Sequence, residues 1–300
     1  MIVNQQVHLP LLTVKRVSLH IKREDLIHPH ISGNKYRKLK YNLIEAQKGG
    51  DIPILTFGGA FSNHIAATAY AGKAYGLQTI GIIRGEELEG KWKSNPTLVK
   101  AKANGMQFKF VSRANYRLKE NPGFLRELKS EFGDYYLLPE GGTNTLAIEG
   151  CREILVPEDH HFQVVSCAVG TGGTLAGIIE SSHDSQQILG FPVLKGDFLK
   201  KDICKFVRKR NWKLLTDYHF GGYAKVNTKL INFINDFKQK TGIPLDPIYT
   251  GKHLYGILDL VEKDHFSPST KILAIHTGGL QGIVGMNQDL KLKNLPLLDL

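Results

Sequence analysis

The chain has 300 residues, of which 42% are hydrophobic, and a formal net charge of +11 at pH 7. This length suits one large or two medium domains, and the apolar content is sufficient for a core. The apolar runs are far shorter than a membrane span and the N-terminus has no basic region followed by an apolar run, so we expect a cytoplasmic protein and no membrane partner.

The cysteines and the excess of basic residues bear on two further classes of protein. Cys151, Cys167 and Cys204 have no CxxC spacing, which argues against a disulfide framework and against a metal site. Basic residues are densest over 195–213, where apolar residues recur at roughly helical spacing and predict an amphipathic helix with a solvated basic face. No nucleic-acid motif accompanies this run, so we do not expect nucleic acid as a partner.

Strand patterns and helix patterns alternate along the chain. The first helix follows the cap residues 32–34 and stops at Gly49. Further helices are expected at 65–75, 96–104, 124–132, 145–155, 175–182, 227–241 and 252–263. Strands are expected at 52–57, 78–84, 106–111, 135–138, 163–169, 187–191, 213–215 and 271–276. This alternation implies parallel pairing through right-handed crossovers, and we predict an α/β fold of two interleaved, open αβα domains with mostly parallel sheets.

Lys35 stands in the first turn of the first helix. The positive end of a helix disfavours a further cation, and the charges of Arg37 and Lys38 act in the same direction. Both effects lower the pKa of an amine and favour a nucleophilic lysine that forms a Schiff base. The alternative, a basic residue on a solvated helix face, is equally compatible with these residues alone.

A glycine-rich loop joins the strand at 163–169 to the next helix. Its residues are Gly170, Thr171, Gly172, Gly173 and Thr174. Backbone N–H groups ahead of a helix can bind a phosphate. The loop lacks the Gly-Lys-Ser/Thr of a P-loop, and the following strand lacks the acidic residue of a dinucleotide site. We therefore expect a phosphate without a dinucleotide; a glycine turn that only packs the helix on the strand is the alternative.

Polar residues also follow other strands at the same edge of the predicted sheets. They are Ser62-Asn63-His64, residues 139–144, residues 245–252 and residues 276–279. Each is typical of a helix cap or a turn when taken alone. The carboxyl ends of parallel strands are where ligands bind in open α/β sheets. A phosphate loop, a lysine and several hydroxyls at these ends suggest pyridoxal 5'-phosphate (PLP) as the cofactor.

Seven motifs occur in a fixed order: KREDL at 22–26, SGNKYRKLKY at 32–41, SNH at 62–64, PEGG at 139–142, GTGGT at 170–174, DPIYTGK at 246–252 and HTGG at 276–279. Together they resemble the 1-aminocyclopropane-1-carboxylate (ACC) deaminase and D-cysteine desulfhydrase family. That family belongs to the tryptophan-synthase-β-like (fold type II) PLP enzymes. The resemblance implies a small domain over 38–144, a large PLP-binding domain over 1–37 and 145–300, and a homodimer.

The resemblance also implies four catalytic residues. Lys35 would bond covalently to PLP and move the α-proton of the substrate. Ser62 would bind the substrate carboxylate and assist the proton transfer. Tyr223 and Tyr249 match the two tyrosines that face substrate and cofactor.

Further positions would bind the cofactor or the substrate, again by resemblance. The 170–174 loop would hold the phosphate, Asn63 the ring hydroxyl of PLP, and Thr250 and Thr277 would complete the cofactor contacts. A small amino acid is the implied substrate, and Ser62, Asn63, His64 and Tyr249 would contact it.

Thr250 bears on the choice of reaction. Deaminases of the family resemble Asp-Pro-x-Tyr-Glu-Gly-Lys, in which the glutamate faces the pyridine nitrogen of PLP. A hydroxyl at this position leaves the ring a weaker electron sink, which suits loss of a β-leaving group better than cyclopropane opening. His64 resembles the desulfhydrases too, because deaminases usually carry glutamine there.

We therefore predict PLP-dependent β-elimination from a small D-amino acid, with D-cysteine giving pyruvate, sulfide and ammonia. Deamination of ACC to 2-oxobutyrate and ammonia is the first alternative. A PLP-binding protein without catalytic activity is the alternative of another class.

Overall fold

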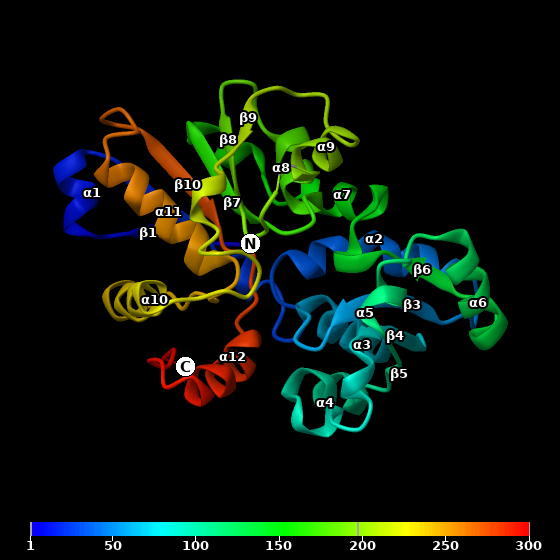
Figure 1. The fold of residues 1–300 in the computed structure, drawn as a ribbon. Helices are drawn as coiled ribbons and strands as arrows, with labels where there is room; N and C mark the ends of the chain where they lie inside the picture. Colours follow the sequence, from blue (N-terminus) through cyan, green and yellow to red (C-terminus); the bar gives the residue numbers. More distant parts are fainter. Residues whose placement is uncertain (1, 197, 300) are drawn as a thin grey trace.

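The computed structural model describes residues 2–196 and 198–299, and its strands form two separate sheets (Figure 1). One sheet has six strands in the order β1-β2-β10-β7-β8-β9, and the other has four in the order β5-β4-β3-β6. Only β1 and β2 pair antiparallel; the other pairs of neighbouring strands among the described residues are parallel. The predicted mostly parallel α/β architecture is confirmed.

The large sheet takes its strands from both ends of the chain. They are β1 (Asn4–Val7), β2 (Ser18–Lys22), β7 (Val164–Val169), β8 (Gln187–Pro192), β9 (Trp212–Leu214) and β10 (Lys271–Ile275). The helices around it are α1 (Pro10–Lys15), α7 (Thr145–Arg152), α8 (Gly173–Ser181), α9 (Phe198–Cys204), α10 (Thr228–Thr241), α11 (Thr250–Glu262) and α12 (Gly282–Leu292).

Strand β10 shows why this sheet has helices on both faces. Its side chains point alternately to the two faces. Ile272 and Ala274 belong to a buried cluster with apolar residues of α10 and α11. Leu273 and Ile275 belong to a second cluster with residues of α7 and α8. A strand buried on both faces reads as a continuous apolar run, and the result here is a three-layer αβα domain.

The small sheet has the same layered arrangement. Its strands are β3 (Ile54–Gly59), β4 (Thr79–Arg84), β5 (Gln107–Val111) and β6 (Tyr136–Leu138). Its helices are α2 (Asn34–Lys48), α3 (Asn63–Tyr75), α4 (Pro96–Ala103), α5 (Arg113–Tyr116) and α6 (Pro122–Phe132). All four strands fall inside residues 38–144, while α2 begins before them; the domain boundaries stay a prediction.

The two lobes meet along α2 and α7 (Figure 1). Gly150 of α7 makes this contact possible, because a Cβ there would lie 2.0 Å from the carbonyl oxygen of Arg37. The chain passes from the large sheet to the small one and back again, as the interleaved arrangement requires. Helix α2, which carries Lys35, is thus fixed between the lobes.

Several helix ends follow the expected capping residues. Ser62, Asn95 and Asn227 cap α3, α4 and α10 through their side-chain oxygens. Five elements have no counterpart among the expected ones: β1, α1, β2, α5 and α12. Short 3₁₀ turns occur at η1 (Glu24–Leu26), η2 (Glu86–Leu88), η3 (Trp92–Ser94), η4 (Glu140–Gly142), η5 (Pro157–His161) and η6 (Thr216–Tyr218).

The predicted amphipathic helix over 195–213 is wrong in extent. Only α9, residues Phe198–Cys204, is helical; Asp197 lies outside the described residues. Leu199 and Ile203 provide its buried face. Beyond it, the backbone N–H of Arg208 donates to Glu180 and the amine of Lys209 donates to the carbonyl of Ser182. These contacts hold the basic residues along the end of α8 rather than in a continuing helix.

Within residues 2–196 and 198–299, no helix combines the length and the apolar character that crossing a bilayer requires.

Candidate active site

Two lysines of α2 share one hydrogen-bond acceptor. The amine of Lys35 donates to the carbonyl oxygen of Gly141 at 3.1 Å, and the amine of Lys38 donates to the same oxygen at 2.9 Å. Burial lowers the pKa of Lys35 well below its ordinary value, and the charge of Lys38 lowers it further. Burial also lowers the pKa of Lys38, to about 8. Both amines are therefore more readily neutral than an exposed lysine.

Arg37, the other basic neighbour of Lys35, faces a different partner. Its guanidinium pairs with Glu24 at 2.9 Å and with Glu153 at 3.3 Å. The sequence left open whether Arg37 and Lys38 act on Lys35 or bind elsewhere. In the structure Lys38 acts on Lys35, and Arg37 binds carboxylates.

The amine of Lys38 also reaches the glycine-rich loop. It donates to the hydroxyls of Thr143 at 2.9 Å and Thr171 at 3.3 Å. Gly172 has φ 86° at the N-cap of α8, and the first-turn N–H groups of α8 point out of the helix end. A Cβ on Gly173 would lie 3.2 Å from the Lys38 amine. The loop is a cradle of N–H groups, hydroxyls and one ammonium, which is the chemistry of a phosphate site.

The start of α2 is fastened to the ends of two strands of the large sheet. Asn34 donates through its side chain to the hydroxyl of Thr174 at 2.7 Å and through its backbone to the carbonyl of Thr277 at 3.2 Å. Gly33 has φ 62°, and a Cβ there would lie 2.0 Å from the Thr277 carbonyl oxygen. Only glycine permits so close an approach. Lys35 is therefore held beside both the phosphate loop and Thr277.

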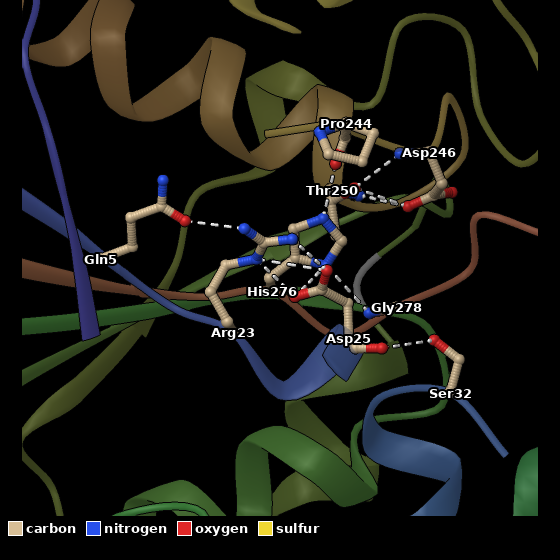
Figure 2. A network of polar contacts seen from close by, with 9 residues as sticks. All are labelled: Gln5, Arg23, Asp25, Ser32, Pro244, Asp246, Thr250, His276 and Gly278. Atoms are coloured by element: carbon tan, nitrogen blue, oxygen red, sulfur yellow. Dashed lines mark hydrogen bonds and ion pairs between the residues drawn. The ribbon is translucent and has the colours of Figure 1, made fainter. Parts of the chain in front are cut away.

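Figure 2 shows the buried network behind this turn. His276 Nδ1 accepts from the backbone N–H of Gly278 at 3.2 Å, so its Nε2 carries the proton and donates to the carbonyl of Pro244 at 2.8 Å. Asp25 lies 3.6 Å from His276 Nδ1 and is paired with Arg23 at 2.7 Å. The network joins the KREDL and HTGG motifs to Pro244, two residues before the DPIYTGK motif, and fixes the turn that carries Thr277.

Thr250 and Asp246 form a closed pair at the start of α11 (Figure 2). The hydroxyl of Thr250 donates to Asp246 Oδ1 at 2.8 Å and accepts from the Asp246 backbone N–H at 2.8 Å. The same carboxylate accepts from the backbone N–H groups of residues 248, 249 and 250. Thr250 is fully buried, and its only proton is committed to Asp246.

Tyr249 and Tyr223 lie close together at the same helix start. Their ring centroids are 6.3 Å apart, at an angle of 70°. A Cβ on Gly170 would lie 3.1 Å from the Tyr249 ring, so this tyrosine borders the phosphate loop. Burial raises the pKa of Tyr249 well above its ordinary value and also raises that of Tyr223. Both phenols therefore keep their protons at neutral pH.

Ser62 and Asn63 begin α3 at the carboxyl end of β3. The Ser62 hydroxyl accepts from the backbone N–H of Ile65 at 3.3 Å, which makes it a helix cap whatever else it binds. A Cβ on Gly279 would lie 3.1 Å from Asn63 Nδ2 and 3.0 Å from the carboxyl carbon of Asp246. Asn63 is thus brought next to the Thr250–Asp246 pair.

His64 lies deeper than its two neighbours, with 2% of its surface exposed. The hydroxyl of Thr56 donates to the carbonyl of Leu138, so it accepts from His64 Nε2 at 2.8 Å. Burial lowers the pKa of His64 well below its ordinary value, and the charges of Lys35 and Lys38 lower it further. Among the described residues no hydrogen-bond donor reaches its Nδ1. Its contact with substrate stays a prediction.

Some residues of the site have no role in the sequence-based prediction. They are Thr143, Asp246 and His276. Lys38 enters the prediction only as a charge near Lys35, and the sequence does not predict its hydrogen bonds to Thr143 and Thr171. Asp246 stands in the quoted DPIYTGK motif, four residues before Thr250. Thr143 belongs to the polar stretch 139–144 at a strand end, but only the fold shows that it contacts Lys38.

The structure thus places Lys35, whose lowered pKa favours the neutral amine, beside a loop with the chemistry of a phosphate site. The family model for "Pyridoxal-phosphate dependent enzyme" matches residues 5–278. The chain belongs to this family. It is 33% identical over 285 residues to the "Putative 1-aminocyclopropane-1-carboxylate deaminase" of Pyrococcus horikoshii, covering 88% of this chain and 85% of that protein.

Other relatives in this family carry both activity names. The "Bifunctional D-cysteine desulfhydrase/1-aminocyclopropane-1-carboxylate deaminase, mitochondrial" of Arabidopsis thaliana is 30% identical over 88% of this chain and 73% of that protein. A D-cysteine desulfhydrase of Klebsiella pneumoniae is 26% identical over 90% of this chain and 91% of that protein. The resemblance to ACC deaminases and D-cysteine desulfhydrases is confirmed.

Solved structures agree with the fold. The crystal structure of an "ACC deaminase homologue" superposes with a TM-score of 0.82 at 30% identity, covering 97% of this chain and 93% of the other. An O-acetylserine dependent cystathionine β-synthase from Helicobacter pylori has a TM-score of 0.65 at 15% identity, over 90% and 89% of the two chains, and supports the fold alone. The predicted fold type II PLP architecture is confirmed.

The chain is a PLP-dependent enzyme, and its residues fit the cofactor. Gly173 has no Cβ, which leaves space for the phosphate in the cradle. A Cβ at this position would lie 3.2 Å from the amine of Lys38. Lys35 has the lowered pKa that a covalent bond to an aldehyde requires. When bound, PLP supplies an electron sink for negative charge at the substrate Cα.

Proposed function

We propose that this enzyme catalyses β-elimination from a small D-amino acid, and that D-cysteine is the first candidate substrate. The single observation that carries the proposal is the state of Thr250. Thr250 occupies the glutamate position of the deaminase pattern Asp-Pro-x-Tyr-Glu-Gly-Lys. Its hydroxyl donates its proton to Asp246 at 2.8 Å. It therefore has no proton to give to a pyridine nitrogen, and it lacks the charge that would keep that nitrogen protonated. This supports a weaker electron sink, which suits elimination better than cyclopropane opening.

The reaction balances with one water. D-cysteine loses its Cα proton, the Cβ–S bond breaks, and sulfur leaves with the bonding electrons as hydrosulfide. The released enamine takes up water to give pyruvate and ammonia. Leaving-group departure relieves the charge at Cα within the same sequence of steps, so the sink need not hold it for long.

Five side chains take part in the proposed reaction. Lys35 moves the Cα proton, because its lowered pKa favours the neutral amine that accepts one. Ser62 and Asn63 bind the substrate carboxylate at the start of α3, where the helix end favours an anion. Tyr223 and Tyr249, which keep their protons, face the substrate and donate hydrogen bonds to it.

ACC deamination is the second candidate, and the names of the relatives favour it. Four relatives between 31% and 33% identical are named putative ACC deaminases. Cyclopropane opening has no leaving group, so it requires the stronger sink. The Thr250–Asp246 pair argues against that sink, and this is why we prefer elimination.

A side-by-side assay decides between the two. Purified enzyme saturated with PLP is incubated with D-cysteine, L-cysteine, D-serine and ACC, and sulfide, pyruvate and 2-oxobutyrate are measured. The proposal predicts sulfide and pyruvate in equal amounts from D-cysteine as the fastest reaction. Faster release of 2-oxobutyrate from ACC would establish the second candidate instead.

A further inference from the structure

Lys252 is a buried cation without a matching anion. It lies in the first turn of α11 with 1% of its surface exposed. Its amine donates to the carbonyl of His219 at 2.9 Å and to that of Gly222 at 2.8 Å. In the part of the chain that the structure describes, no carboxylate lies within ion-pair distance of it. The positive helix end opposes it further, so the position needs an explanation.

The backbone that Lys252 holds is unusual. Phe220, Gly221, Gly222 and Ala224 all have left-handed φ angles, of 52°, 94°, 117° and 55°. The two residues that are not glycine each cost about 1–2 kcal/mol in this conformation. Such a segment keeps its shape only where surrounding contacts over-determine it. Tyr223 lies within this segment, between Gly222 and Ala224.

Helix α11 supplies those contacts from one face. The hydroxyl of Tyr218 donates to Asp259 at 2.7 Å, and the ring of Phe220 meets that of Tyr255 edge-on at 4.9 Å. Residues 252, 255 and 259 follow helical spacing, so they form one stripe along α11. Lys252 lies at one end of this stripe, and its amine reaches Gly222, the residue before Tyr223. Tyr249 is the N-cap residue of the same helix.

We propose that Lys252 is a positioning residue that fixes Tyr223 against Tyr249 by holding the carbonyls of His219 and Gly222. The inference rests on the proposed function only in that the two tyrosines face the substrate. Lysine suits the task because it is long, carries several donors and has no acceptor. Each carbonyl also accepts one backbone N–H, so the amine completes its second acceptor position.

A double-mutant cycle tests this role in the PLP-loaded enzyme. Lys252→Met keeps the length of the side chain and removes the donors, and Tyr223→Phe removes the phenol. Each change should lower kcat/KM on the order of 10–100-fold, since small misplacements at a site cost this much. The double variant should lose no more than the worse single variant. Lys252→Gln, which keeps an amide donor, should recover part of the loss.

A protease measurement tests the same role without substrate. Lys225 is exposed and follows the held segment. Cleavage after Lys225 by a lysine-specific protease should be several-fold faster in Lys252→Met than in the parent, at equal PLP absorbance. Lys240→Met, a change at an exposed lysine of α10, is the matched control and should leave cleavage and kinetics unchanged.

The outcomes separate this inference from the proposed function. Unchanged cleavage after Lys225 in Lys252→Met overturns the inference even if D-cysteine is the substrate. Multiplicative losses in the double variant overturn it too. If D-cysteine is not turned over but cleavage accelerates, the proposed substrate is wrong and the positioning role stands. If Lys252→Met does not fold, Lys252→Gln is measured in its place, and parental cleavage in that variant overturns the inference.

Discussion

Lys35 and Lys38 place their amines on the same carbonyl oxygen, that of Gly141. Two adjacent ammonium groups repel each other, so each favours the neutral form of its neighbour. Lys38 faces the phosphate cradle through Thr143 and Thr171. We expect an anionic phosphate there to hold Lys38 protonated, while Lys35 keeps its lowered pKa and forms the covalent bond.

Lys38→Met should weaken PLP binding without removing Lys35. Loss of a charged hydrogen bond costs about 1.5–3 kcal/mol, so the Kd for PLP should rise about 10–100-fold. Titration of the cofactor-free protein with PLP, followed by visible absorption, measures this. Lys48→Met at the exposed end of the same helix is the control. Equal Kd values for Lys38→Met and the parent would contradict the assignment.

Gly173→Ala tests the shape of the cradle. The added Cβ would lie 2.9 Å from the Thr143 methyl carbon and 3.2 Å from the Lys38 amine, so both groups must shift. We expect PLP affinity to fall about tenfold, which corresponds to about 1.4 kcal/mol. Gly90→Ala, where no atom lies within 4 Å of the new Cβ, should bind PLP like the parent. An unaffected Gly173→Ala variant would show that no ligand phosphate packs there.

Thr250→Val tests the pair with Asp246. Valine keeps the shape of threonine but leaves Asp246 without one donor and one acceptor in a buried site. The free energy of unfolding should fall by about 1–3 kcal/mol, measured by urea denaturation. Thr228→Val at the exposed start of α10 is the control. A parental value for Thr250→Val would mean that the pair does not stabilise the helix start.

Much of the fold follows from local patterns in the sequence. Cap residues such as Ser62, Asn95 and Asn227 stand where helices begin, and continuous apolar runs mark the buried strands. Strand β2 is different, because it pairs with β10 some 250 residues away in register Ser18↔Lys271, and no local signal states this. The basic run after Cys204 is not helical because contacts with Glu180 and Ser182 determine its path.

The residues of the site likewise divide into those with a local sequence signal and those without one. Lys35 and the 170–174 loop have local signatures, a lysine at a helix start and glycines before a helix. Thr143 reaches Lys38 across 105 residues of chain, and Asn34 reaches Thr174 across 140. Such contacts form because the chain passes from one lobe to the other and back, so residue spacing alone does not reveal them.

The buried lysines make the stability of the cofactor-free protein depend on pH. Lys252 has a folded pKa of about 8 against an ordinary 10.5. Between these values the unfolded chain holds a proton that the folded protein has released. The free energy of unfolding therefore rises with pH in this window, by about 1.4 kcal/mol per pH unit for this lysine.

Urea denaturation at pH 8 and pH 9.5 measures this contribution. Lys252→Met should gain about 1–2 kcal/mol less than the parent between the two pH values, while Lys240→Met should gain as much as the parent. Equal gains in Lys252→Met and the parent would show that the amine of Lys252 is not titrated in this range.

The covalent attachment site is the most direct test of the central claim, that Lys35 bonds to PLP and Lys38 serves its phosphate. Borohydride reduction of the PLP-loaded enzyme fixes the cofactor on its lysine, and fragment-ion mass spectrometry then locates the added mass. The result predicted here is modification of Lys35 in the parent and in Lys38→Met, and none on either lysine in Lys35→Ala. Modification of Lys38 in the parent, with Lys35 unmodified, would contradict the account.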